Sequence, residues 1–243
     1  MRSLVNSVKK MSTKSAAQNN CIDFLDYSLQ DPMCQRIIQQ MNSINLDSLG
    51  VTGTDAAADP YHFQQNLNKV TIEGNEDYRL VLFFIKKGQM MPLHDHPNMS
   101  VYFKLMFGKL KFYSYDKVEE KFKYNKFSND EYEELIGTKA KVKATKSEAK
   151  ILDQKNLLLV RPSVGNMHQF VAQEDSCFFD ICLPNYTQDS LRRITYFNEV
   201  ADDSLGDGLT KLEYHTTPPV MPVGFEVAEL EYRGDFNEKQ KFL

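Results

Sequence analysis

The spacing of hydrophobic residues changes near residue 67, and this change predicts two kinds of structure. Between Cys21 and Met41, apolar residues recur at roughly helical spacing, interrupted by Asp31-Pro32. Because Pro is favoured in the first turn of a helix, we expect Pro32 to begin the second of two short helices. Residues 43–66 predict an irregular connector.

From residue 67 onward, short runs rich in β-branched and aromatic residues alternate with Gly, Asn or charged breaks. This pattern predicts many short strands and favours an all-β sandwich or barrel. The expected strands are 67–72, 78–86, 100–107, 109–116, 149–152, 157–161, 168–172, 177–183 and 227–232. Residues 119–148 are crowded with Lys, Glu and Asn, which predicts an exposed insertion that can hold one short helix.

The length of 243 residues, 42% of them hydrophobic, fits one domain with elaborations. We expect a helical cap and connector over 19–66 and a barrel over 67–243, preceded by a basic, disordered tail over 1–18. The tail holds four basic residues and no acidic one between Met1 and Lys14, and it lacks the apolar segment of a secretory signal. A mitochondrial presequence stays open as an alternative.

Composition narrows the classes of partner. The net charge of −4 gives no reason to expect nucleic acid or an anionic membrane, and no apolar run approaches the roughly 20 residues of a membrane span. The four cysteines include no C-x-x-C pair, so neither a zinc knuckle nor a disulfide framework is expected. We expect a monomer in a reducing compartment, the cytoplasm or also the nucleus.

The candidate chemistry begins with two histidines, His94 and His96, that follow Gly88 and precede Pro97. Residues at i and i+2 of an extended strand point to the same face, so both imidazoles can reach one metal ion. Neutral imidazole suits Zn, Cu, Fe and Ni alike, and the pair alone does not choose among them. A third histidine, His168, lies in another turn-then-strand context, and a barrel can bring it beside the pair.

These residues carry a family resemblance. Gly88, His94-x-His96 and Gly108 resemble the first cupin motif, and the second is matched by Pro162, Gly165 and His168 with one extra residue between Pro and Gly. The first motif usually adds a Glu after its second His, where this chain has Ser100 and Val101. The longer match is to the thiol dioxygenases that include cysteamine (2-aminoethanethiol) dioxygenases and plant cysteine oxidases. Its segments are Pro92–Pro97, Met99, Lys104–Gly108, Tyr115-Asp116, Gly165–His168 and Phe179–Tyr186, with Asn98 and Asn185 as departures.

The resemblance implies a cupin (double-stranded β-helix, jelly-roll) barrel that holds iron(II) on His94, His96 and His168. A three-histidine set leaves the ion with its full charge and open positions for a thiolate and dioxygen. Both oxygen atoms would end on sulfur as a sulfinic acid.

The resemblance also implies catalytic roles for Asp180 and Tyr186. Asp180 interrupts an apolar run, where a carboxylate is costly to bury unless something pairs with it. It is expected to orient the substrate amine or a histidine ligand, with a solvent-facing carboxylate as the alternative. Tyr186 is expected to donate a hydrogen bond to bound oxygen or thiolate, with a strand-end cap as the alternative.

The remaining candidates carry less weight. His62 and His215 have no partner at ligand spacing and are predicted to be surface histidines. Cys177 and Cys182 are predicted to be small core residues. Arg192-Arg193 is expected either at the mouth of the active site or on the surface.

The implied substrates are the N-terminal cysteine of proteins or peptides, or cysteamine, together with dioxygen. An enzyme for free cysteine needs a cation for the carboxylate, and the sequence places none clearly near the motif. N-terminal cysteine is therefore preferred, with a role as an oxygen sensor that feeds an N-degron pathway. Two alternatives stay open: a cupin enzyme with another metal and substrate, and a non-enzymatic cupin binding module.

Overall fold

The computed structural model describes residues 1–17, 31–51, 65–123, 127–155, 157–202, 204–219, 221 and 225–232. The helices are α1 (Arg2–Ala17), α3 (Pro32–Ser43), the 3-10 helix η1 (Asp47–Leu49), α4 (Glu120–Lys123) and α5 (Asn129–Gly137). The strands are β1 (Leu67–Gly74), β2 (Arg79–Ile85), β3 (Met90–Asp95), β4 (Ser100–Phe107), β5 (Leu110–Lys117), β6 (Lys141–Lys146), β7 (Lys150–Leu152), β8 (Leu157–Val160), β9 (Met167–Ala172), β10 (Ser176–Leu183), β11 (Tyr196–Val200), β12 (Leu209–His215) and β13 (Val227–Leu230). No helix among these described residues is long and apolar enough to cross a membrane.

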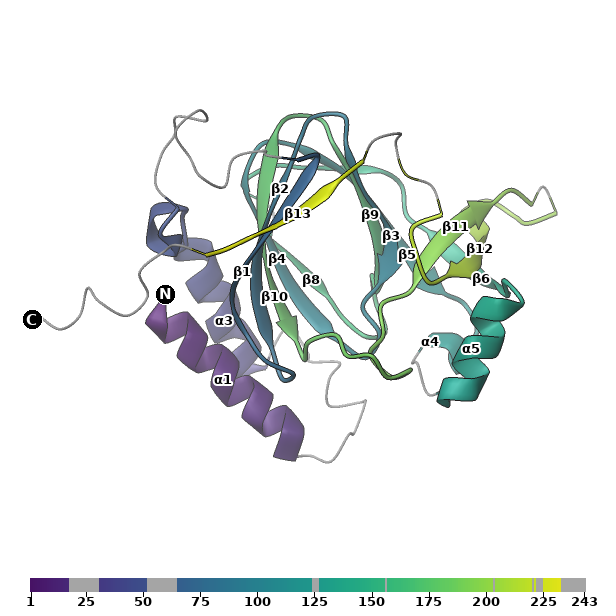
Figure 1. The fold of residues 1–243 in the computed structure, drawn as a ribbon, viewed down its shortest axis with the longest axis horizontal. Coiled ribbons are helices and arrows are strands. Elements are labelled where there is room, and N and C mark those ends of the chain that lie inside the picture. The colour runs from purple at the N-terminus through teal and green to yellow at the C-terminus, as the bar shows by residue number, and fades with distance from the viewer. Residues whose placement is uncertain are drawn as a thin grey trace, which may run out of the picture.

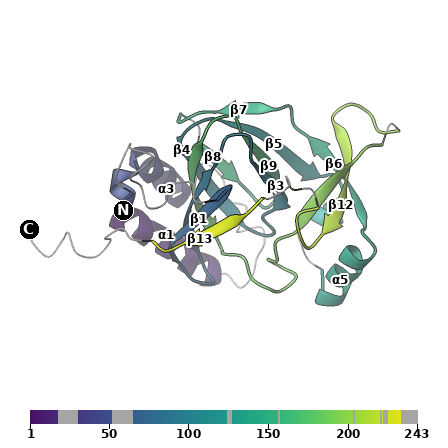
Figure 2. The same cartoon turned by 45° about the horizontal axis from the view of Figure 1, so that its top comes forward.

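Two sheets face each other and form a barrel (Figures 1 and 2). One sheet has the order β13-β1-β2-β10-β4-β8 and the other has the order β6-β12-β11-β3-β9-β5-β7. All pairs are antiparallel except β1 with β13. Aromatic side chains from both sheets fill one part of the interior, where the rings of Phe103 and Phe170 stack with centroids 5.0 Å apart. The expected all-β cupin barrel with few helices is confirmed.

The helices α1 and α3 cover the outer face of the first sheet (Figure 1). In α1, the buried residues Leu4, Val5, Val8 and Met11 form one apolar stripe, which packs in the same cluster as α3 and the sheet. The expectation of a disordered basic tail is therefore wrong for residues 2–17. The basic residues of this segment led to the expectation of a disordered tail, although the spacing of the four apolar residues is helical.

The helix α3 begins as the sequence predicts. The carboxylate of Asp31 accepts hydrogen bonds from the backbone N–H groups of Met33 and Cys34, at 2.8 and 3.3 Å, and Pro32 occupies the first turn. The helix that we expect before Asp31 lies outside the described residues, as does His62.

The Lys-rich segment 119–148 is more structured than an exposed loop. Ser128 and Glu131 form a capping box at the start of α5, and the Tyr132 side chain of that helix is buried. The segment also contributes β6, which pairs with β12 and β5 and buries Val142 and Ala144 completely. The expectation of an insertion with one short helix omitted this strand, because its lysines alternate with only two fully buried positions.

The strand β10 is buried along its whole length because both of its faces are covered. Phe179 and Ile181 pack in the cluster with α1 and α3, and Phe178 packs in the barrel interior. Alternation along a strand therefore places Asp180 and Cys182 inside the barrel, where both line a cavity. This arrangement excludes the solvent-facing alternative for Asp180.

Candidate metal centre

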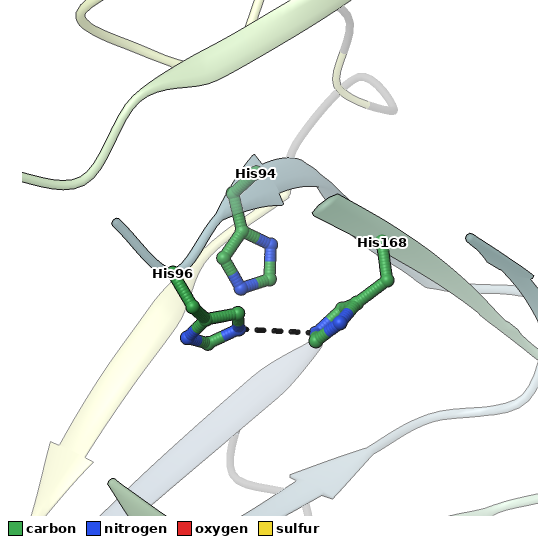
Figure 3. A group of neighbouring side chains, drawn as sticks. All are labelled: His94, His96 and His168. Atoms are coloured by element: carbon green, nitrogen blue, oxygen red, sulfur yellow. Dashed lines mark hydrogen bonds between the residues drawn. The ribbon is translucent and has the colours of Figure 1, made fainter. Parts of the chain in front are cut away.

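Three histidines, on β3, just after β3 and on β9, point toward one another (Figure 3). His94 on β3 and His168 on β9 are direct cross-strand partners, and His96 follows the end of β3. Side chains at directly opposed positions lie side by side on one face of a sheet. The register of β3 and β9 therefore brings together residues that are more than seventy positions apart in the chain.

The spacing of the ring nitrogens fits one metal ion. Nε2 of His96 lies 3.2 Å from Nε2 of His168, and the ligand atoms of all three histidines lie within 4.8 Å of one another. Two nitrogens about 2.1 Å from one ion, at an angle of roughly 90–110°, are about 3.0–3.4 Å apart. No other group of three or more His, Cys, Asp or Glu with this proximity occurs among the described residues.

An irregularity in β3 directs His94 toward the centre. The register between β3 and β9 shifts between Met91 and His94, at Pro92, which cannot donate a ladder hydrogen bond. The carbonyl of Pro92 then accepts a hydrogen bond from Nδ1 of His94, with a separation of 2.8 Å. Because Nδ1 carries the proton, Nε2 has the free lone pair that a metal needs.

Tyr186 performs the same task for His96. Its hydroxyl donates to the carbonyl of Asp95 at 2.8 Å and lies 2.6 Å from Nδ1 of His96. Since the single hydroxyl proton goes to Asp95, Nδ1 of His96 must be the donor in the second bond. The lone pair of its Nε2 is then free on the side of His168.

All three histidines are buried and uncharged near neutral pH. Burial lowers the pKa of His94 to about 4 and lowers the pKa values of His96 and His168 well below the usual value. Neutral imidazole is the form that binds a metal. The chemistry of the donor set and its spacing together indicate a metal site.

Hydrogen bonds hold the second half of the site in register. The carboxylate of Asp116 accepts from the backbone N–H groups of Gly165 and Asn166, at 2.6 and 3.3 Å. The Asn166 amide donates to the carbonyl of His96 at 2.7 Å. These bonds connect the turn before His168 to the segment that carries His96.

A buried ion pair lies next to the histidines. Nζ of Lys117 is 3.6 Å from Oδ2 of Asp95, and their side chains are 4% and 0% exposed. The other carboxylate oxygen of Asp95 accepts a bond of 2.9 Å from the backbone N–H of Thr195. Asp95 separates the two histidines in the sequence, so this pair anchors the metal-binding segment to β5 and to the segment before β11.

The three histidines open onto a cavity of about 380 Å³. Asp180 and Tyr186 line the same cavity, so the structure brings together all five residues expected at the site. Most of the remaining lining is aromatic or aliphatic: Phe83, Met91, Phe170, Phe178, Ile194, Met221 and Phe225. A small polar molecule would therefore be oriented by few groups.

Asp180 has an unusual environment for a carboxylate. Its cross-strand partners are Val81 on β2 and Phe103 on β4, and its Oδ1 has no hydrogen-bond partner among the described residues. Burial raises the pKa of Asp180 to about 8, although the charge of Arg79 opposes the shift. A carboxyl group without a partner in a cavity can accept a hydrogen bond from a ligand.

The comparison with known proteins agrees with the geometry of the site. The model of the PCO_ADO family matches residues 35–236. The chain belongs to the PCO_ADO family. The match includes the three histidines and every residue described above that lines the cavity.

Similar proteins within this family are named as thiol-oxidising enzymes. Plant cysteine oxidase 1 of Arabidopsis thaliana is 28% identical over 131 residues, which are 54% of this chain and 41% of that protein. A probable 2-aminoethanethiol dioxygenase of Dictyostelium discoideum is 26% identical and covers 51% of both chains. The 2-aminoethanethiol dioxygenase of Mus musculus is 24% identical over 66% of this chain and 65% of its own. The matched segments span between 41% and 65% of the length of these curated relatives.

Two basic side chains line the cavity that were not predicted from the sequence to lie there. Arg79 and Lys69 line the cavity, contrary to the expectation that no cation lies near the motif. The available signal was weak, because each is a lone cation at or within an apolar strand, a position more often solvated. Tyr196, the cross-strand partner of His94, was also missed.

Ser100 and Val101 are buried on β4 and supply no carboxylate. Arg193 lies 2.6 Å from Glu133, and Arg192 donates to the carbonyl of Glu76, so neither lines the cavity. Cys177 and Cys182 are both buried core residues, as predicted, and Cys182 also lines the cavity. His215, predicted to be a surface residue, is partly buried beside Glu213.

Proposed function

We propose that this protein is an iron(II)-dependent thiol dioxygenase that acts on an aminothiol. The substrate is the N-terminal cysteine of a protein or peptide, or cysteamine, and the product is the corresponding sulfinic acid. Both atoms of one dioxygen molecule are added to sulfur, so RSH and O₂ give RSO₂H with no other reductant. One observation carries the proposal: three neutral imidazoles converge at a cavity. Among the described residues that line this cavity, Asp180 is the only acidic one.

The histidines His94, His96 and His168 would hold the metal. When bound, iron(II) supplies a positive charge that favours the thiolate form of the substrate and a centre that can use dioxygen. No carboxylate joins the three imidazoles in the described cluster, so the ligand set adds no negative charge. The proposed metal is iron because the family relatives are named as oxidases and dioxygenases.

Asp180 would bind the substrate amine. Both proposed substrates carry an ammonium group two carbons from the thiol, and a carboxylate is its natural acceptor. Ammonium binding would also offset the cost of an ionised Asp180 in an apolar cavity. The bound amine then fixes where the thiol can lie relative to the three histidines.

Tyr186 would act by orienting His96 and not by contacting the substrate. Its hydroxyl already bonds Asp95 and His96, and this use of the hydroxyl supports a positioning role. The aromatic lining of the cavity would exclude water around the reacting sulfur.

The direct experiment uses purified protein loaded with iron(II) and a short peptide that begins with Cys. We expect the peptide mass to rise by two oxygen atoms only in air, and only when His94 and His168 are both intact. Cysteamine turnover with an unchanged peptide would make the protein a small-molecule enzyme. If neither thiol is oxidised although iron is bound, the proposal fails and the other cupin functions take its place.

We further propose that the reaction reports the oxygen concentration through an N-degron pathway in a reducing compartment, the cytoplasm or nucleus. The basis is the family alone. Turnover measured across cellular oxygen concentrations tests the idea, and a rate that is saturated throughout that range contradicts it.

A further inference from the structure

Arg79 lines the cavity, and its guanidinium group has no role in metal binding by the three histidines or in amine binding by Asp180. It opens β2 and is the cross-strand partner of Cys182 on β10. Its guanidinium carbon lies 5.9 Å from the ring centroid of Tyr186, and the hydroxyl of that ring bonds His96. A single aromatic side chain therefore lies between this cation and a proposed metal ligand.

The guanidinium of Arg79 has no carboxylate partner in the part of the chain that the structure describes. Its buried Nε has no hydrogen-bond partner either. Arg193, by contrast, has a carboxylate partner, because its guanidinium lies 2.6 Å from a carboxylate oxygen of Glu133. Leaving a buried donor of a charged group unpaired costs free energy, unless a ligand completes the bond.

Lys69, the second cation in the lining, is already engaged. Its ammonium lies 2.9 Å from a carboxylate oxygen of Glu229 on β13. Among the described lining residues, Arg79 is thus the cation that remains available to a ligand.

Arg79 and Asp180 both line the cavity but occupy separate positions on neighbouring strands. Asp180 pairs in register with Val81, two residues along β2 from Arg79. Diagonal positions across an antiparallel pair are about 7–8 Å apart, and neither Nε of Arg79 nor Oδ1 of Asp180 has a hydrogen-bond partner among the described residues. A ligand that carries both an ammonium and a carboxylate would satisfy both groups at once.

We propose that Arg79 binds a carboxylate of the aminothiol substrate while Asp180 binds its amine. This inference rests on the proposed function and narrows its substrate class. The carboxylate has two possible sources: the α-carboxylate of free cysteine, or an acidic side chain at the second position of a peptide that begins with Cys. The cavity of about 380 Å³ can hold either one, and cysteamine offers no group to Arg79.

The test compares matched substrates that differ only in a carboxylate. The pairs are L-cysteine with L-cysteinamide, and C-terminally amidated Cys-Glu and Cys-Gln peptides, with cysteamine as the substrate that lacks both. The proteins are the iron-loaded wild type, Arg79→Gln, Arg79→Lys and the control Arg193→Gln, which changes an arginine outside the cavity. Thermal unfolding of each variant establishes that it folds.

In the wild type we expect kcat/KM for the acidic member of one pair to exceed that of its neutral partner. The expected factor is on the order of 10- to 100-fold, the range of a hydrogen bond to a charged group. Arg79→Gln should remove this preference through KM, because the acidic substrate loses more than its neutral partner, and Arg79→Lys should partly restore it, since Lys keeps the charge without the planar fork. Arg193→Gln should behave as the wild type. The pair that shows the preference identifies the source of the carboxylate.

Equal kcat/KM values within both pairs would overturn the inference. So would an Arg79→Gln variant that loses the acidic and neutral substrates by the same factor. A wild type that oxidises none of these thiols contradicts the proposed function instead. Anaerobic calorimetry with L-cysteine and L-cysteinamide then decides the role of Arg79: tighter binding of L-cysteine that is lost in Arg79→Gln supports it, and equal binding overturns it.

Discussion

The Asp180→Asn variant should lose less stability than the wild type as the pH rises from 5 to 7. The side chain of Asp180 is 7% exposed and lies between Val81 and Phe103, so its charged form is poorly solvated. Burial raises its pKa from 3.8 to about 8. Asparagine has nearly the same shape but cannot ionise.

The sign follows from proton binding. The unfolded chain releases the Asp180 proton near pH 4, whereas the folded protein keeps it up to about pH 8. Between these values the folded state binds the extra proton, so the stability that this carboxyl contributes is complete below pH 4. It is lost progressively as the pH rises through 8.

The magnitude follows from one proton over two pH units. Between pH 5 and pH 7 the wild type should lose up to about 2.7 kcal/mol from this group alone, at about 1.36 kcal/mol per unit. Because water in the cavity and the charge of Arg79 lessen the penalty, we expect a difference of about 1–2 kcal/mol. The three buried histidines titrate in both proteins, and their contribution cancels in the difference.

Urea unfolding of the metal-free proteins at pH 5, 6 and 7 measures this effect. The quantity of interest is the change in unfolding free energy with pH for the wild type minus that for Asp180→Asn. Asp207→Asn, at an exposed turn between β11 and β12, serves as the control. Parallel pH profiles for the wild type and Asp180→Asn would show that the carboxyl is not held protonated, and the assignment of an unpaired buried acid would be wrong.

Four further substitutions test other parts of the structure. His168→Ala should lower metal content from about one ion per chain to near zero, as measured by elemental analysis, whereas His215→Ala should retain it; full occupancy in His168→Ala would refute the site. Tyr186→Phe should weaken metal affinity or activity by about 10- to 100-fold in competition titrations and assays, and an unchanged affinity and rate would refute its orientation of His96. Lys117→Ala should destabilise the fold by about 3–5 kcal/mol because it leaves Asp95 buried without its partner, against about 1 kcal/mol or less for Lys146→Ala at the exposed pair with Glu199. Met11→Ala should cost about 2–5 kcal/mol in urea unfolding if α1 is packed, and no change would support a disordered tail after all.

Local pattern was sufficient for most of the barrel and for the metal ligands. Strands such as β1, β2, β4 and β10 were expected within one or two residues of their observed ends, because β-branched and aromatic runs with turn residues between them have few other interpretations. The segment of β3 was expected to be extended, because His94 and His96 are two residues apart, but its bounds were not among the expected strands. The structure accommodates Pro92 within it at a register shift. β12 was missed although its buried positions Thr210, Leu212 and Tyr214 alternate with less buried ones.

The helix α1 shows where a charge-based interpretation fails. Its lysines suggested a solvated tail, but the apolar residues between them share one face. The apolar face of α1 is buried because it packs against a second apolar surface, which α3 and the outer face of the first sheet form. The amphipathic spacing can be seen in the sequence, whereas the surface that receives it is set by tertiary structure.

The sequence by itself identified the three-histidine set, because His94 and His96 are two residues apart in an extended segment and His168 occupies a recognisable turn-then-strand context. It also marked Asp180 as anomalous in an apolar run. It could not decide which way Asp180 points, since both faces of β10 are covered and both neighbours are apolar. The sequence likewise did not reveal Arg79, whose meaning depends on its cross-strand partner, Cys182, and on the cavity that both line. Direction and neighbourhood across a sheet depend on the register between distant strands, and that register is fixed only when the whole barrel closes.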